Sequence, residues 1–176
     1  MIFSTLQNAI VTRLLWDAYF TLPTAKVTAL AENALDLLSE YEKAIGKFGI
    51  AAIVATPSVT PGERIDLATV TIVIGICEHV SVNRGRGGAN KPASDVGAKA
   101  MALLRNWSPN ADLWAPLQFV SFGRVGEDEK TGADYWELTM LTQTMLELFV
   151  TVLGTEDDVA IGDENEAALI VSPTAA

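Results

Sequence analysis

The chain has 176 residues and a formal net charge of −10, from 22 acidic side chains against 12 lysines and arginines. General nucleic-acid binding depends on Lys and Arg neutralising phosphates, so this charge argues against such a function and against docking on an anionic membrane. The length and the hydrophobic fraction of 49% predict one folded domain, and the single cysteine, Cys77, excludes an intrachain disulfide.

The acidic excess is concentrated at the C-terminal end. Residues 155–176 contain no basic residue and hold Glu156, Asp157, Asp158, Asp163, Glu164 and Glu166. We therefore expect an α+β domain over residues 1–153 and an acidic extended or disordered arm over residues 154–176. No run of about 18 apolar residues and no basic leader are present, so we expect a protein without membrane spans or targeting signals.

Two helices are expected in the N-terminal part. Ser4 can cap a helix to about Tyr19, because apolar side chains recur there at three- and four-residue spacing. The same spacing predicts a second helix over Lys26–Lys47, which ends at Gly46 or Gly49. Residues 26–29 also fit an extended segment, and both interpretations are kept.

The strands are the strongest pattern. Ile50–Val59 predicts a strand, and Pro57 and Pro61 push its end toward a sheet edge or a loop. Thr69–Val82 alternates apolar and other residues over its whole length, and only Glu78 interrupts the apolar face. Ordinary strands have about five or six residues, so we expect this strand to project beyond its own core.

The remaining pattern completes an α+β arrangement. It predicts, in order, a flexible basic loop, a helix, a strand, a polar turn and a long strand, at Asn83–Pro92, Ser94–Asn106, Leu117–Val125, Gly126–Ala133 and Tyr135–Phe149. The fold class expected is therefore α+β, with an antiparallel-rich mixed sheet of long strands flanked by two N-terminal helices and one middle helix.

Motifs for catalysis, metal binding or cofactor binding are weak. Cys77 and His79 share a strand face, but no second Cys or His completes a metal site. Their spacing along a strand, about 6–7 Å, is also long for a nucleophilic pair. Lys91 precedes Pro92, whereas a phosphate-binding loop requires Ser or Thr there. We expect no enzyme activity, no metal and no cofactor.

Six residues are candidates for contact with another subunit or a partner. The basic loop supplies three of them, a tryptophan one and the acidic turn two: Arg84, Arg86, Lys91, Trp114, Glu127 and Asp128. The loop can grip an acidic surface or face passing DNA, and a solvated loop is the alternative. The alternatives are core packing for the tryptophan and a solvated turn for the acids.

The order of elements, together with three segments of sequence, resembles one family. The segments are Val70-Thr-Ile-Val-Ile-Gly-Ile-Cys-Glu-His-Val-Ser-Val-Asn-Arg-Gly, Ala102-Leu-Leu-Arg-Asn-Trp-Ser-Pro and Tyr135-Trp-Glu-Leu-Thr-Met-Leu-Thr-Gln-Thr-Met. Over residues 1–150 the chain is similar to the small neck and tail-completion proteins of tailed bacteriophages, the tail terminators in particular. The resemblance is one of pattern and size, and it assigns no functional residue.

The resemblance implies a structural role in a virion. Family members form rings, commonly hexamers, at the head-proximal end of the tail, where they end tail-tube polymerisation and join the tail to the head connector. The implied partners are further copies of the chain, the tail-tube protein and a neck or head-connector protein, with DNA passing unbound and no membrane. Such a protein is assembled in the host cytoplasm. The alternatives are a stopper-type neck adaptor on the portal, a small enzyme and a ligand-binding domain.

Overall fold

A computed structural model describes residues 2–21, 26–62, 64 and 66–145. Its elements, in chain order, are α1 (Ile2–Leu15), β1 (Thr28–Ala31), α2 (Leu37–Phe48), β2 (Ile50–Pro61), β3 (Leu67–His79), α3 (Val80–Asn83), α4 (Ala93–Leu104), β4 (Gln118–Asp128) and β5 (Ala133–Met145). Among the helices of these residues, none has the length and apolar sequence that crossing a membrane requires.

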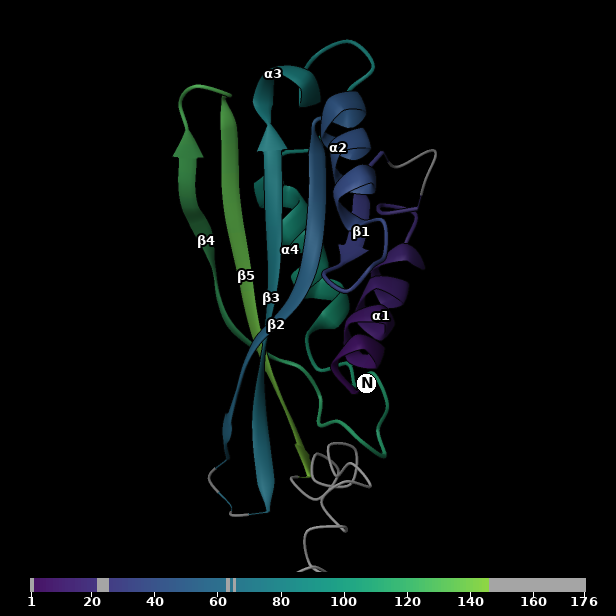
Figure 1. Cartoon of the computed structure of the whole chain (residues 1–176), viewed down its shortest axis with the longest axis vertical. Helices are drawn as coiled ribbons and strands as arrows, with labels where there is room; N and C mark the ends of the chain where they lie inside the picture. The colour runs from purple at the N-terminus through teal and green to yellow at the C-terminus, as the bar shows by residue number, and fades with distance from the viewer. Residues whose placement is uncertain (1, 22–25, 63, 65, 146–176) are drawn as a thin grey trace, which may run out of the picture.

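The strands form one sheet in the order β1-β2-β3-β5-β4. β1 runs parallel to β2 and every other neighbouring pair is antiparallel. β3 and β5 stay in register along their whole lengths, from Leu67 opposite Met145 to His79 opposite Ala133. The lower ends of β2 and β3 extend past the helices (Figure 1). The predicted α+β class, with an antiparallel-rich mixed sheet and flanking helices, is confirmed.

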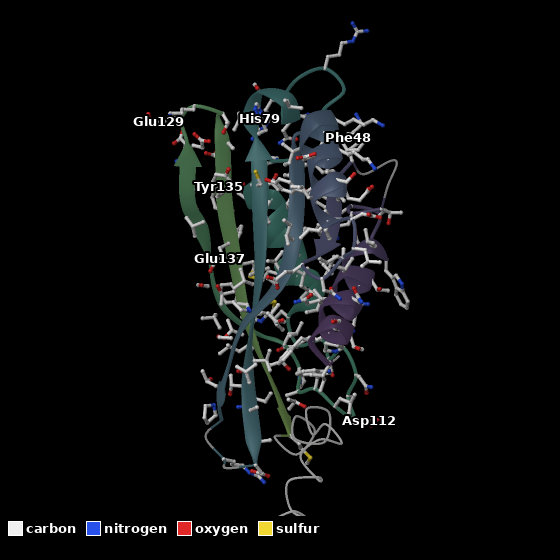
Figure 2. The ribbon with its side chains drawn as sticks, in the orientation of Figure 1. Phe48, His79, Asp112, Glu129, Tyr135 and Glu137 are labelled. Atoms are coloured by element: carbon white, nitrogen blue, oxygen red, sulfur yellow. The ribbon has the colours of Figure 1, made fainter. Side chains whose placement is uncertain are left out.

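The two faces of the sheet have different environments. Alternate residues of β3 are at most 1% exposed and pack with α1 and α4 in the core: Ala68, Val70, Ile72, Ile74 and Ile76. The opposite face is half-buried along most of β3 and is covered near its upper end, where Tyr41 of α2 and Cys77 line one cavity. Tyr135 and Glu137 of β5 lie on this open face (Figure 2). The alternation of apolar and other residues in the sequence of β3 therefore corresponds to a sheet with one fully buried face.

The predicted helix over Lys26–Lys47 is wrong in its first half. Thr28–Ala31 form β1, and the helix begins only at Leu37. In β1 the chain pairs with β2, from Thr28 opposite Ala51 to Ala31 opposite Val54, and three of its four residues are buried. The extended alternative for residues 26–29 was closer to the structure. The apolar residues of this segment fit a strand and a helix equally well, so the sequence pattern could not choose between them.

The predicted strand Thr69–Val82 ends early, at His79, and the chain turns into α3. Its partner β5 begins at Ala133, opposite His79, so the regular ladder between the two strands ends there. The amide of Val80 instead donates to the carbonyl of Gly132 at 3.2 Å.

The last predicted strand, Tyr135–Phe149, is described as far as Met145. The predicted domain boundary at residue 153 lies outside the described residues.

The two-faced sheet predicts different costs for neighbouring substitutions in β3. Ile74→Ala removes a fully buried side chain, so we expect the free energy of unfolding to fall by about 2–5 kcal/mol. Val73→Ala, on the open face, should cost about 1 kcal/mol or less. Urea unfolding of both variants measures the difference, and equal costs would contradict the assignment of the faces.

Candidate assembly surfaces

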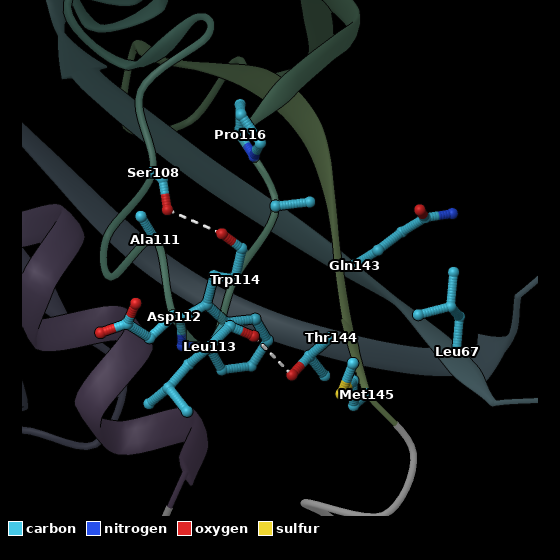
Figure 3. A pocket seen from close by; sticks show the side chains of 11 residues that line it. Leu67, Ser108, Ala111, Asp112, Leu113, Trp114, Pro116, Gln143, Thr144 and Met145 are labelled. Atoms are coloured by element: carbon cyan, nitrogen blue, oxygen red, sulfur yellow. Dashed lines mark hydrogen bonds between the residues drawn. The ribbon is translucent and has the colours of Figure 1, made fainter.

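Trp114 lies in the core of the chain. Its side chain is 3% exposed, and its carbonyl accepts a hydrogen bond from the Ser108 hydroxyl at 2.7 Å (Figure 3). It borders a mostly apolar cavity of about 360 Å³ whose walls include Leu67, Leu113 and Met145. The structure therefore favours core packing for Trp114, and its contact with a partner stays a prediction.

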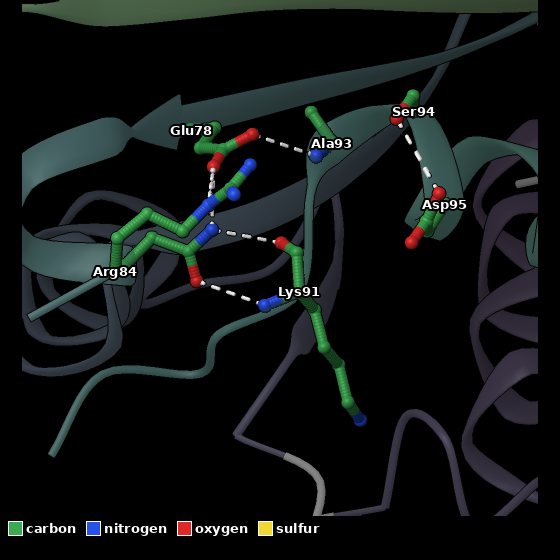
Figure 4. Close-up of polar contacts among 7 residues, drawn as sticks. Glu78, Arg84, Lys91, Ala93, Ser94 and Asp95 are labelled. Atoms are coloured by element: carbon green, nitrogen blue, oxygen red, sulfur yellow. Dashed lines mark hydrogen bonds and ion pairs between the residues drawn. The ribbon is translucent and has the colours of Figure 1, made fainter.

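Glu78, the residue that interrupts the apolar face of β3, is a buried anchor. Its carboxylate is 3% exposed and accepts hydrogen bonds from Asn83 Nδ2 at 2.6 Å, Ala93 N at 2.7 Å and Arg84 Nε at 3.1 Å (Figure 4). Ala93 is the first residue of α4, where the helix dipole favours a negative charge. One carboxylate thus connects the end of β3 to α3 and α4.

The loop between α3 and α4 is fastened along its length. Asn83 closes it by donating from Nδ2 to the carbonyl of Lys91 at 2.8 Å and accepting at Oδ1 from the Lys91 amide at 3.3 Å. The amide of Ala89 donates to the carbonyl of Phe48 at 3.0 Å. Lys26 Nζ donates to two further loop carbonyls, both at 3.0 Å. We expected a flexible loop, whereas these contacts hold it against the end of α2.

The three basic candidates of this loop differ in what they contact. Arg84 forms an ion pair with buried Glu78. Lys91 Nζ donates to the carbonyl of Tyr19 at 2.8 Å and lies 3.9 Å from the centre of the Tyr19 ring, and burial lowers the pKa of its ammonium group. Arg86 is exposed and makes no hydrogen bond or ion pair with the described residues. Arg86 is thus the candidate whose charge stays available to a partner.

The acidic turn between β4 and β5 is a structured tip. The Asp128 carboxylate accepts from the Thr131 hydroxyl at 2.8 Å and the Lys130 amide at 3.0 Å, and these bonds lower the pKa of Asp128. Glu127 pairs with Arg124 at 2.6 Å, and Arg124 also pairs with Asp134. Glu129, at the outer end of the turn (Figure 2), is exposed and has no such contact within the described residues.

β4 is the edge strand opposite β1 and exposes apolar side chains. Phe119, Val120 and Val125 are 43%, 49% and 63% exposed. The pairing of β4 with β5 skips one residue at Val120 and one at Val125, so each forms a bulge. The alternating pattern of Leu117–Val125 predicted the strand but not its place at the edge, so the sequence did not single out these residues.

Cys77 and His79 do not form a catalytic pair. Cys77 is buried beside Tyr41 and Tyr135, and burial raises the pKa of its thiol, which keeps it protonated. The His79 ring instead contacts the Ser81 hydroxyl, with 3.2 Å between Nδ1 and Oγ. No carboxylate among the described residues bonds the other ring nitrogen, and these residues contain no group of three metal-ligating side chains.

Comparisons with known proteins inform the fold. No protein-family model and no curated protein matches this chain. Among solved structures, a chain of the "virion of native gene transfer agent (GTA) particle" matches with a TM-score of 0.51 and 18% sequence identity, covering 80% of this chain and 94% of that chain. At this identity the likeness shows a shared fold. The place in a virion is a property of the matched chain.

Loss of the Glu78 anchor should destabilise the domain. Glu78→Ala leaves the buried Ala93 amide without its acceptor, removes one of the two acceptors of Asn83 Nδ2 and leaves half-exposed Arg84 without its partner, so we expect a loss of about 2–3 kcal/mol in the free energy of unfolding. Glu129→Ala, an exposed glutamate without such contacts, is the matched control and should change it by less than about 0.5 kcal/mol. Urea denaturation decides, and comparable stabilities of the two variants would refute the anchor.

The protonated, buried thiol of Cys77 predicts slow chemical modification. A disulfide reagent should react with the folded protein far more slowly than with protein unfolded in urea, and the folded rate should rise as pH increases, because only the thiolate attacks. Absorbance of the released thiolate follows the reaction. Equal rates in the folded and unfolded protein would show that the thiol is accessible and reactive.

Proposed function

We propose that this chain is a structural virion protein that forms a ring at the head-proximal end of a phage tail, ends tail-tube polymerisation and joins the tail to the head connector. The observation that carries the proposal is the fold shared with a chain of a gene transfer agent virion over 80% of this chain. The sequence resemblance to tail terminators points to the same position in a particle.

The exposed surfaces support assembly with other protein chains. β4 presents apolar side chains to solvent. Leu38 in the first turn of α2 is 69% exposed, and Leu35, just before this helix, is also exposed. Exposed apolar patches of this kind mark contacts between proteins. The sheet also provides a tall, rigid frame on which such surfaces keep fixed positions (Figure 1).

A catalytic role has less support in the geometry. Cys77 is buried and burial raises the pKa of its thiol, and the His79–Ser81 contact lies at the surface without a carboxylate to orient the ring within the described residues. A nucleophile is activated by an adjacent base, by a lowered pKa or by a metal, and the raised pKa of Cys77 is the opposite of such activation. The stopper-type neck adaptor, which binds the portal, is the second candidate, since it would also assemble through exposed protein-binding surfaces.

Assembly of tail tubes distinguishes these roles. Tube protein polymerised with this chain should give shorter tubes in electron micrographs, with a ring of this protein at one end. A neck adaptor would leave tube length unchanged and bind portal rings in sedimentation experiments. If the chain stays monomeric by light scattering, binds neither tube nor portal, and leaves tube length unchanged, the proposed function is wrong.

A further inference from the structure

Two surfaces of opposite charge lie at the same end of the sheet. We name as the acidic tip the turn and strand ends that carry Glu127, Asp128, Glu129 and Asp134. We name as the basic end the surface formed by the α3–α4 loop, the end of α2 and the segment before β1, which carries Lys26, Lys47, Arg84, Arg86 and Lys91. In a chain with a net charge of −10, this grouping of cations is a local reversal of sign.

The charged side chains of these two surfaces form no ion pair with one another among the described residues of one copy. The acidic tip joins β4 and β5, which lie on one side of β3, while α2 and β2 lie on the other side (Figure 1). The tip is fixed by the hydrogen bonds of Asp128, and the loop of the basic end is fixed against Phe48. The Glu129 carboxylate and the Arg86 guanidinium make no hydrogen bond or ion pair with the described residues. Each belongs to a segment that hydrogen bonds hold in a fixed position.

The edge of β4 continues the surface of the acidic tip. Its bulges at Val120 and Val125 interrupt the regular row of backbone groups that an added strand would need, so contact here proceeds through side chains. Val125, 63% exposed, lies three residues before Asp128. An apolar patch beside a charged tip has the composition of an interface core with a polar rim.

We propose that the acidic tip and β4 edge of one copy dock against the basic end of a second copy. The two contacting surfaces are different, so the contact is heterologous, and repeated contacts of that kind close into a ring when the rotation allows. Charge complementarity fits a second copy of this chain as the partner, because the tip carries four acids against Arg124 and Lys130 and the basic end carries an excess of cations. The inference rests on the proposed ring and names the residues of its subunit contact.

Charge exchange tests this contact. Arg86→Glu and Glu129→Lys each place like charges opposite one another, so each should weaken self-association by about tenfold or more. The double variant restores opposite charges and should recover the association of the unchanged protein to within about threefold. Both side chains are exposed and make no hydrogen bond or ion pair with the described residues, so circular dichroism should show intact folds.

Matched controls alter net charge elsewhere. Arg105→Glu, after α4, and Asp112→Lys, at the opposite end of the molecule from Glu129 (Figure 2), should leave self-association unchanged. Sedimentation velocity measures the association constants in low salt and in 0.5 M NaCl, where screening should weaken the contact of the unchanged protein.

The outcomes separate this contact from the proposed function. Rings that form on tail tubes regardless of the single substitutions would overturn the contact and leave the proposed function standing. Single variants that weaken association without recovery in the double variant would mean that each surface meets a different partner, which also overturns it. Absence of self-association in the unchanged protein, alone and on tubes, would overturn both.

Discussion

The burial of one face of β3 is the constraint on which the rest of the structure depends. β3 is the middle strand of the sheet, paired with β2 on one side and β5 on the other, and its inward side chains meet α1 and α4. Because every second residue must face that core, the register of both neighbouring strands is set with it. A slip by one residue would expose the isoleucines and bury the threonines of the open face.

Glu78 lies at the end of that apolar face, where buried hydrogen bonds to its carboxylate replace apolar packing. Its carboxylate is compensated by three donors, Asn83, Arg84 and Ala93, and all three belong to segments outside the sheet. The geometry of the α3–α4 loop is therefore tied to the core through a buried charge, and breaking such a site costs more than losing a surface pair. This is how a loop of basic and glycine residues holds a defined position at the end of the sheet.

The sequence does not show which of the candidate surface residues have partners within the chain. Arg84, Arg86 and Lys91 look equivalent as basic residues of one loop, yet two of them stabilise the chain internally and only Arg86 is left without a described partner. Glu127 and Asp128 likewise stabilise the tip, whereas Glu129 was not singled out. For Lys91 the partner is the distant Tyr19, which no spacing along the chain indicates. Glu127 and Asp128 bond to residues two or three positions away, but the composition of the turn does not show which of its acids will be bonded and which left exposed.

The sequence by itself determined the class of fold, the long two-faced strand and the absence of a recognisable catalytic motif, since alternation and composition follow from local geometry. The sequence also showed that Glu78 interrupts the apolar face of this strand, but not that its carboxylate accepts hydrogen bonds from α3 and α4. Only the tertiary structure decided that Thr28–Ala31 form a strand, that β4 is the exposed edge and that the two charged surfaces share one end of the sheet. These features depend on which segments pair across the chain, and backbone pairing depends on long-range packing that no local pattern records.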